Sequence, residues 1–137
     1  MNETKQTQTR STDNSRKSIL ARGCDPVASL HASKAIPPKI GNPEYVPTTD
    51  DADFIEKLKS RAWSVIFFAP GACRFSAAQR PIPGGNSDTQ GWTLEQYREL
   101  VREYQGETVQ IVETLEERET ITRLKSALEK ARETKQR

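Results

Sequence analysis

The stretch that decides the fold is WSVIFFA, residues 63–69. It is rich in β-branched and aromatic residues and apolar on both faces, which is typical of a strand covered on both sides. Pro70 and Gly71 follow it and stop the strand. We therefore predict a central strand here.

Helices are expected on both sides of this strand in the sequence. Residues 51–61 follow a run of oxygen-bearing side chains suited to an N-cap and place apolar residues on one face. A second helix starts with the capping residue Thr93 and is closed by Gly106. A last helix starts from the capping pair Thr114 and Glu117.

A second, shorter strand is predicted over residues 108–113. Two strands joined by a helix indicate a parallel pair with a right-handed crossover. Because two strands make a marginal sheet, a third could come from the region of Tyr45 and Val46, from the loop over residues 70–91, or from another subunit. The fold class is α/β: a small domain with a short parallel sheet flanked by helices, preceded by a disordered N-terminal tail.

Large apolar side chains are unevenly spread, with 9 in residues 1–50 and 23 in residues 51–137. Charged residues make up 29% of the chain and hydrophobic residues only 34%, so one core cannot include the whole length. We predict a disordered polar and basic tail over residues 1–35, a proline-rich strap over residues 36–47, and a small α/β domain over residues 48–137.

The strap has four prolines in twelve residues, which favours an extended chain. Its candidate binding residues are Ile36, Ile40, Tyr45 and Val46. They can pack against the surface of the domain, and they can equally dock into the groove of a protein partner.

Several classes of protein are disfavoured. The longest apolar run covers residues 62–69, far short of the roughly 20 residues that cross a bilayer, and the N-terminus has no signal core. We expect an intracellular, cytoplasmic protein that does not bind membranes. Cys24, Cys73 and His31 lack the spacing of zinc ligands, so we expect no metal and no cofactor.

The tail carries a weak electrostatic signal for nucleic acid. Residues 1–39 hold seven basic and three acidic residues. They could make a few phosphate contacts, but they contain no cluster of Arg or Lys and no aromatic residue on which a base could stack. Nucleic-acid binding is therefore a minor alternative.

The loop after the apolar strand is the only candidate for chemistry. Cys73 follows the strand, and the adjacent Arg74 could stabilise its thiolate. In that interpretation Cys73 is a nucleophile or a redox thiol. The alternative is a small buried hydrophobe, because free cysteine is among the most buried residue types and no histidine lies in the predicted domain.

Residues 53–78 resemble the active-site region of monothiol glutaredoxins, in which a helix and an apolar strand precede a Cys-Gly-Phe-Ser motif. The corresponding residues are Cys73-Arg74-Phe75-Ser76. The resemblance implies a thioredoxin-like fold, and of the family's functional residues only Cys73 carries over. The same loop also resembles the phosphate loop of low-molecular-weight tyrosine phosphatases, with Ala69 in place of the nucleophile.

The leading hypothesis from the sequence is a non-enzymatic interaction or assembly protein, whose tail and strap order on a protein partner. The second is a divergent thioredoxin-like or glutaredoxin-like thiol protein that uses Cys73. The third is weak nucleic-acid binding through the basic tail. Oligomeric state stays open.

Overall fold

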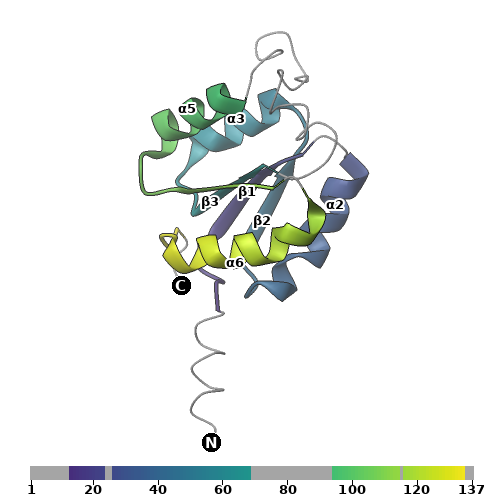
Figure 1. Ribbon diagram of the computed structural model, residues 1–137. Coiled ribbons are helices and arrows are strands. Elements are labelled where there is room, and N and C mark those ends of the chain that lie inside the picture. The colour runs from purple at the N-terminus through teal and green to yellow at the C-terminus, as the bar shows by residue number, and fades with distance from the viewer. Residues whose placement is uncertain (1–12, 24–25, 69–93, 115, 135–137) are drawn as a thin grey trace, which may run out of the picture.

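The computed structural model describes residues 13–23, 26–68, 94–114 and 116–134. They form a four-stranded parallel sheet with the strand order β2-β1-β3-β4 and helices on both faces (Figure 1). The predicted fold class, a small α/β domain with a short parallel sheet, is confirmed. The predicted tail over residues 1–12 lies outside the described residues.

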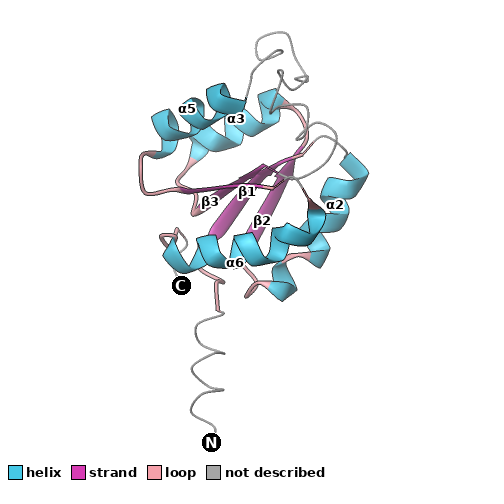
Figure 2. Cartoon of the chain, viewed as in Figure 1, coloured by secondary structure: helices cyan, strands magenta, loops and turns pink. Residues whose placement is uncertain are grey.

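The elements alternate between strands and helices along the chain (Figure 2). The strands are β1 (Ser18–Arg22), β2 (Glu44–Thr48), β3 (Val65–Phe68) and β4 (Gln110–Glu113). The helices are α2 (Pro26–Ala35), α3 (Asp51–Ser60), α5 (Leu94–Gln105) and α6 (Thr120–Lys130), with the short 3-10 helices η1 (Pro37–Lys39) and η2 (Glu117–Glu119).

The predicted central strand is confirmed as β3. All four of its residues are buried, and it pairs with β1 on one side and β4 on the other. Its alternate side chains enter two separate cores, which is why it reads as apolar on both faces. The predicted second strand is β4, at one end of the sheet.

Each face of the sheet has its own core and its own pair of helices (Figure 1). On one face, α3 and α5 pack over a cluster that includes Leu20, Phe54, Phe68 and Tyr97, whose three rings are in mutual contact. On the other face, α6 packs over Ile19, Val65, Phe67 and Val112 and their neighbours, with α2 beside it over β2.

The structure corrects the predicted tail. Residues 18–22 form β1, and all five are buried between β2 and β3. Residues 26–35 form α2. A five-residue strand with only two large apolar residues gives little signal in the sequence, because its stability comes from pairing with strands more than twenty residues away.

The structure also settles which of the two alternatives for the strap the chain adopts. Residues 36–47 include η1 and most of β2, the edge strand next to β1. The Tyr45 and Val46 region is thus the third strand of the sheet. Pro47 is tolerated because β2 has a partner on one side only, so its missing N–H removes no ladder bond there.

Two of the three predicted helix starts can be assessed. Asp50 caps α3 by accepting a hydrogen bond from the Asp53 amide at 2.8 Å, as expected. The capping pair of Thr114 and Glu117 is wrong, because α6 starts later, at Thr120, after η2. Thr93 lies outside the described residues, whereas Gly106 closes α5 with a φ of 81°, as predicted.

The strand order places a topological switch point between β1 and β3. The chain steps from β1 to β2 on one side, then returns past β1 to β3 and β4 on the other. We call the end where all four strands finish the carboxyl edge, and the end where they start the amino edge. In open parallel sheets, ligands bind outside the carboxyl ends of the strands at such a point.

Candidate functional site

The carboxyl edge consists of one row of residues in register. Thr48, Arg22, Phe68 and Glu113 are the last residues of the four strands, and each is paired with its neighbour across the sheet. Arg22 lies two residues after Leu20, so it is on the face that α3 and α5 cover. The row therefore places a basic residue between a threonine and a phenylalanine, in the middle of the sheet.

Arg22 is a buried charge, with only 3% of its surface exposed. Its Nη1 donates to the carbonyl of Gly23, the residue that follows β1, so the guanidinium lies at the carboxyl edge. Beside it, the Thr48 hydroxyl donates to the Ala21 carbonyl at 2.5 Å, and the Gly23 amide donates to the Thr48 carbonyl at 2.9 Å. These bonds fix the backbone around the arginine.

Helix N-termini converge on the same edge. α3 follows β2 and α6 follows β4, so both start at the carboxyl ends of strands. α5 starts there too, because its last residue, Gln105, contacts Trp63 at the amino edge. The partial positive charge of each N-terminus adds to that of Arg22 and favours anions.

Two acidic side chains near this edge, Glu113 and Asp53, have cationic partners. Arg98 of α5 donates to both carboxylate oxygens of Glu113, at 2.5 and 2.6 Å. Hydrogen bonding to Glu113 raises the pKa of Arg98, so this guanidinium stays charged. Asp53 accepts a hydrogen bond from Lys57 one helical turn away. Asp50 also lies at this edge, where it caps α3 by accepting a hydrogen bond from the Asp53 amide.

Two buried hydroxyls at the carboxyl edge have no hydrogen-bond partner. They are Oγ1 of Thr114, directly after β4, and Oγ1 of Thr120, the first residue of α6. Thr114 is 0% exposed and Thr120 is 5% exposed. Both residues lie on the α6 side of the sheet, Thr114 two residues after Val112 and Thr120 one turn before Leu124. Buried polar groups are normally paired, so these two are unusual.

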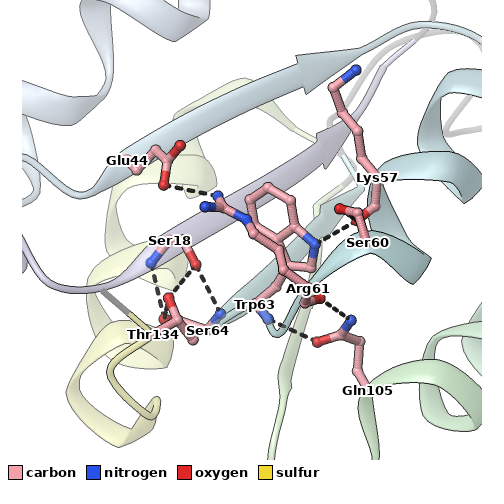
Figure 3. A network of polar contacts seen from close by, with 9 residues as sticks. All are labelled: Ser18, Glu44, Lys57, Ser60, Arg61, Trp63, Ser64, Gln105 and Thr134. Carbon is pink, nitrogen blue, oxygen red and sulfur yellow. Dashed lines mark hydrogen bonds and ion pairs between the residues drawn. The ribbon is translucent and has the colours of Figure 1, made fainter. Parts of the chain in front are cut away.

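The amino edge holds a dense network of polar contacts (Figure 3). At its centre, Oε1 of Gln105 accepts a hydrogen bond from the Trp63 amide at 2.8 Å. Its Nε2 donates to the carbonyls of Leu58 and Arg61, at 2.7 and 2.8 Å. Arg132 donates to the same Gln105 side chain at 2.9 Å and to the Trp63 carbonyl at 3.0 Å. The side chain of Gln105 therefore uses both its amide nitrogen and its oxygen.

Hydroxyl groups extend this network at the starts of β1 and β3 (Figure 3). Ser64 Oγ accepts a hydrogen bond from the Ser18 amide at 2.9 Å, and the Ser64 amide donates to the Ser18 carbonyl at 3.0 Å. Thr134 Oγ1 lies 2.5 Å from Ser18 Oγ. The amide of Thr134 donates to the Arg16 carbonyl at 2.9 Å. The network thus ties the C-terminal segment to the start of the sheet.

Trp63 is held through its ring nitrogen, its ring face and its backbone amide (Figure 3). Its Nε1 donates to the Lys57 carbonyl at 2.9 Å, and the Arg61 guanidinium lies 3.9 Å from the ring centroid. Arg61 also pairs with Glu44 at 2.8 Å. These contacts join α3, β2 and the entry to β3, which is a structural role.

The predicted site residues have different outcomes. Cys73 and Arg74 lie outside the described residues, so the predicted thiol site has no described geometry. The strap residues do: Ile40 is buried in the core under α6, Ile36 and Tyr45 pack against the same core, and Val46 packs against the core under α3 and α5. Their observed contacts are with the chain itself.

Two basic residues of the predicted tail contact the C-terminal part of the chain. Lys17 Nζ donates to the Leu128 carbonyl at 2.5 Å, and Arg16 lies 3.9 Å from Glu133. These contacts account for two of the positive charges that suggested nucleic-acid binding. Lys5 and Arg10, the basic residues of the first ten positions, lie outside the described residues.

Metal and membrane sites were also sought in the described part of the chain. Residues 13–23, 26–68, 94–114 and 116–134 contain no group of three or more His, Cys, Asp or Glu side chains placed to hold a metal ion. Within the same residues, every helix is too short or too polar to span a bilayer.

Comparisons with known proteins give no family assignment. No protein-family model matches the chain, and searches of curated proteins and of solved structures find no significant similarity. Functional argument therefore depends on the geometry of the chain itself.

Arg22 was not predicted as a functional residue, because it lies in the stretch that was predicted to be a disordered tail. The only signal available was an arginine followed by glycine at the end of a short apolar pair, Ile19 and Leu20. That pattern becomes informative only once β1 is known to be a central strand.

Proposed function

We propose that this protein binds a small ligand with an oxyanion group, a phosphate or a carboxylate, at the carboxyl edge of its sheet. The observation that carries this proposal is the buried guanidinium of Arg22 at the end of β1, at the switch point. Its position matches the place where open parallel sheets bind ligands.

The energetic cost of Arg22 supports a functional role. Removing a guanidinium from water costs several kcal/mol, and an apolar residue of similar volume at a buried position is often as stable or more stable. Leu20 and Phe68 beside it show that this face of the sheet accepts apolar side chains. The cost of burying a guanidinium at this position supports a role in recognition.

The charge of the surroundings indicates an anion. A guanidinium matches phosphate and carboxylate groups with two parallel hydrogen bonds. The N-termini of α3, α5 and α6 add partial positive charge at the same edge.

The test is ligand-dependent thermal unfolding of the full chain. Sodium pyrophosphate and sodium citrate are compared with sodium chloride at equal ionic strength, for the wild type, Arg22→Met and the control Arg102→Met. Arg102 is a half-exposed residue near the C-terminal end of α5. A ligand at about 100 times its Kd stabilises the folded state by about 2.7 kcal/mol.

We expect at least one of the two anions to raise the unfolding temperature of the wild type and of Arg102→Met, but not of Arg22→Met. Pyrophosphate alone would indicate a phosphate ligand, and citrate alone a carboxylate ligand. Equal shifts in all three proteins, or no shift in the wild type, would overturn the proposal. If Arg22→Met does not fold, Arg22→Lys keeps the charge without the paired donors, and its affinity should fall about tenfold.

The other functions expected from the sequence stay predictions. A thiol protein using Cys73 concerns residues outside those described. Nucleic-acid binding and partner binding through the tail depend in part on residues 1–12, which also lie outside them. The cytoplasmic location likewise stays a prediction. Interaction with a protein partner has support from a different surface, α2.

A further inference from the structure

Helix α2 presents an exposed face of mixed apolar and basic character. Val27 is 78% exposed and Leu30 is 55% exposed. They are two of the three large apolar side chains that are exposed in the described part of the chain, the third being Tyr104 on α5. Two such residues one turn apart suggest a contact surface rather than a chance exposure.

The spacing of these residues defines one face of the helix. Val27, Leu30, His31 and Lys34 stand at positions i, i+3, i+4 and i+7, and all four are exposed. α2 packs on β2 and η1, and its small residues Ala32 and Ala35 are less exposed than the four above. We call the outward set of Val27, Leu30, His31 and Lys34 the α2 face.

The charged residues of α2 and η1 have one sign. Residues 26–43 contain Lys34, Lys39 and His31 and no acidic residue. Lys39 lies on η1, which packs against α2, and it is exposed. A partner for this surface therefore needs apolar side chains and negative charge together.

The chain's own segments and a second copy fit this surface poorly. Residues 1–12 carry one acidic and two basic residues, and residues 69–93 carry one acidic and two basic residues. A symmetric dimer through α2 would place the α2 face against itself, and this face contains no acidic residue. Neither arrangement supplies the missing negative charge.

We propose that the α2 face docks an acidic amphipathic helix of another protein. The apolar side chains of the partner pack on Val27 and Leu30, and its carboxylates lie near Lys34 and Lys39. The partner helix would pack along this exposed face, where its apolar side chains give affinity and its charges give selectivity. This surface is separate from Arg22, so either proposal can fail without the other.

The test uses two fluorescent synthetic helical peptides with the full chain. Both carry leucines at i, i+3, i+4 and i+7; one has glutamates on the flanking positions and the other has lysines. Binding is measured by anisotropy for the wild type, Leu30→Glu, Lys34→Glu and the control Lys125→Glu, an exposed residue of α6 on the same side of the sheet. Circular dichroism confirms folding, and Lys34→Glu, at an exposed position, serves if Leu30→Glu does not fold.

We expect saturable binding of the acidic peptide, weakened about tenfold or more by Leu30→Glu and by Lys34→Glu and unchanged by Lys125→Glu. The basic peptide should not bind. Equal binding of both peptides, or no binding of the acidic peptide, would overturn the proposal. So would a dimer of the wild type in sedimentation that Leu30→Glu dissociates, because the occupant would then be a second copy.

Discussion

The two edges of the sheet treat buried polar groups in opposite ways. At the amino edge, the side chains of Gln105 and Ser64 are satisfied by several partners from different elements. At the carboxyl edge, the hydroxyls of Thr114 and Thr120 are buried without a partner, and Arg22 is a buried charge. The difference supports a structural role for the amino edge, and it motivates our proposal that the carboxyl edge binds a ligand.

The largest expected effect comes from the amino edge. Gln105→Leu removes the acceptor of the Trp63 amide and the donor to the Leu58 and Arg61 carbonyls. Leaving these buried groups unsatisfied should lower the free energy of unfolding by about 3 kcal/mol. Urea denaturation measures it, with Glu103→Gln, at an exposed position of the same helix, as the control. A loss of stability no greater than that of the control would show that the hydrogen bonds of Gln105 do not stabilise the fold.

Removing a single hydroxyl should lower stability at the amino edge and raise it at the carboxyl edge. Ser64→Ala takes away the acceptor of the buried Ser18 amide and should cost about 1–2 kcal/mol of stability. Thr114→Val removes a hydroxyl with no partner and should gain about 1 kcal/mol, because no buried polar group is left to desolvate. Urea denaturation of both variants in the same buffer gives the comparison. Destabilisation by both substitutions would break the distinction between the edges.

The smallest effect appears only at alkaline pH. Burial raises the pKa of Tyr45 above its ordinary value. Above about pH 10 the unfolded chain ionises this residue while the folded chain keeps it neutral, so the residue's contribution to stability is lost as pH rises. Near pH 11 the wild type should lose about 1 kcal/mol more than Tyr45→Phe, relative to pH 8.

Thermal unfolding at the two pH values measures this difference. Tyr104→Phe is the matched control, because Tyr104 is exposed. If Tyr45→Phe loses as much stability as the wild type does, the hydroxyl of Tyr45 is not held in a low-dielectric environment. The account of β2 as a strand packed into the core would then need revision.

The sequence indicated the parts of the fold whose signals are local. β3 could be predicted from one apolar run, and α3 from an N-cap and an amphipathic pattern, because both signals lie within a dozen residues. β1 could not, because its burial depends on β2 and β3 on either side of it. The start of α6 was missed because Thr114 and Glu117 resemble a capping box that the chain does not form.

The candidate site was less predictable than the fold for the same reason. The row of Thr48, Arg22, Phe68 and Glu113 is assembled from four strands separated along the chain, so no local motif marks it. The exposed face of α2 was not predicted either, because Val27 and Leu30 lie within the stretch that was assigned to a disordered tail. What the sequence lacked was the knowledge that this helix packs on a domain.

The most direct test of the central claim, that the carboxyl edge is a ligand site, is a titration of the ¹⁵N-labelled full chain with sodium pyrophosphate followed by NMR. The account predicts saturable shifts of the amides of Gly23 and Thr114 and of the Arg22 side chain, with the indole N–H of Trp63 unmoved at the amino edge. Shifts centred on Trp63 and Ser64, or non-saturating shifts spread over surface lysines, would contradict it.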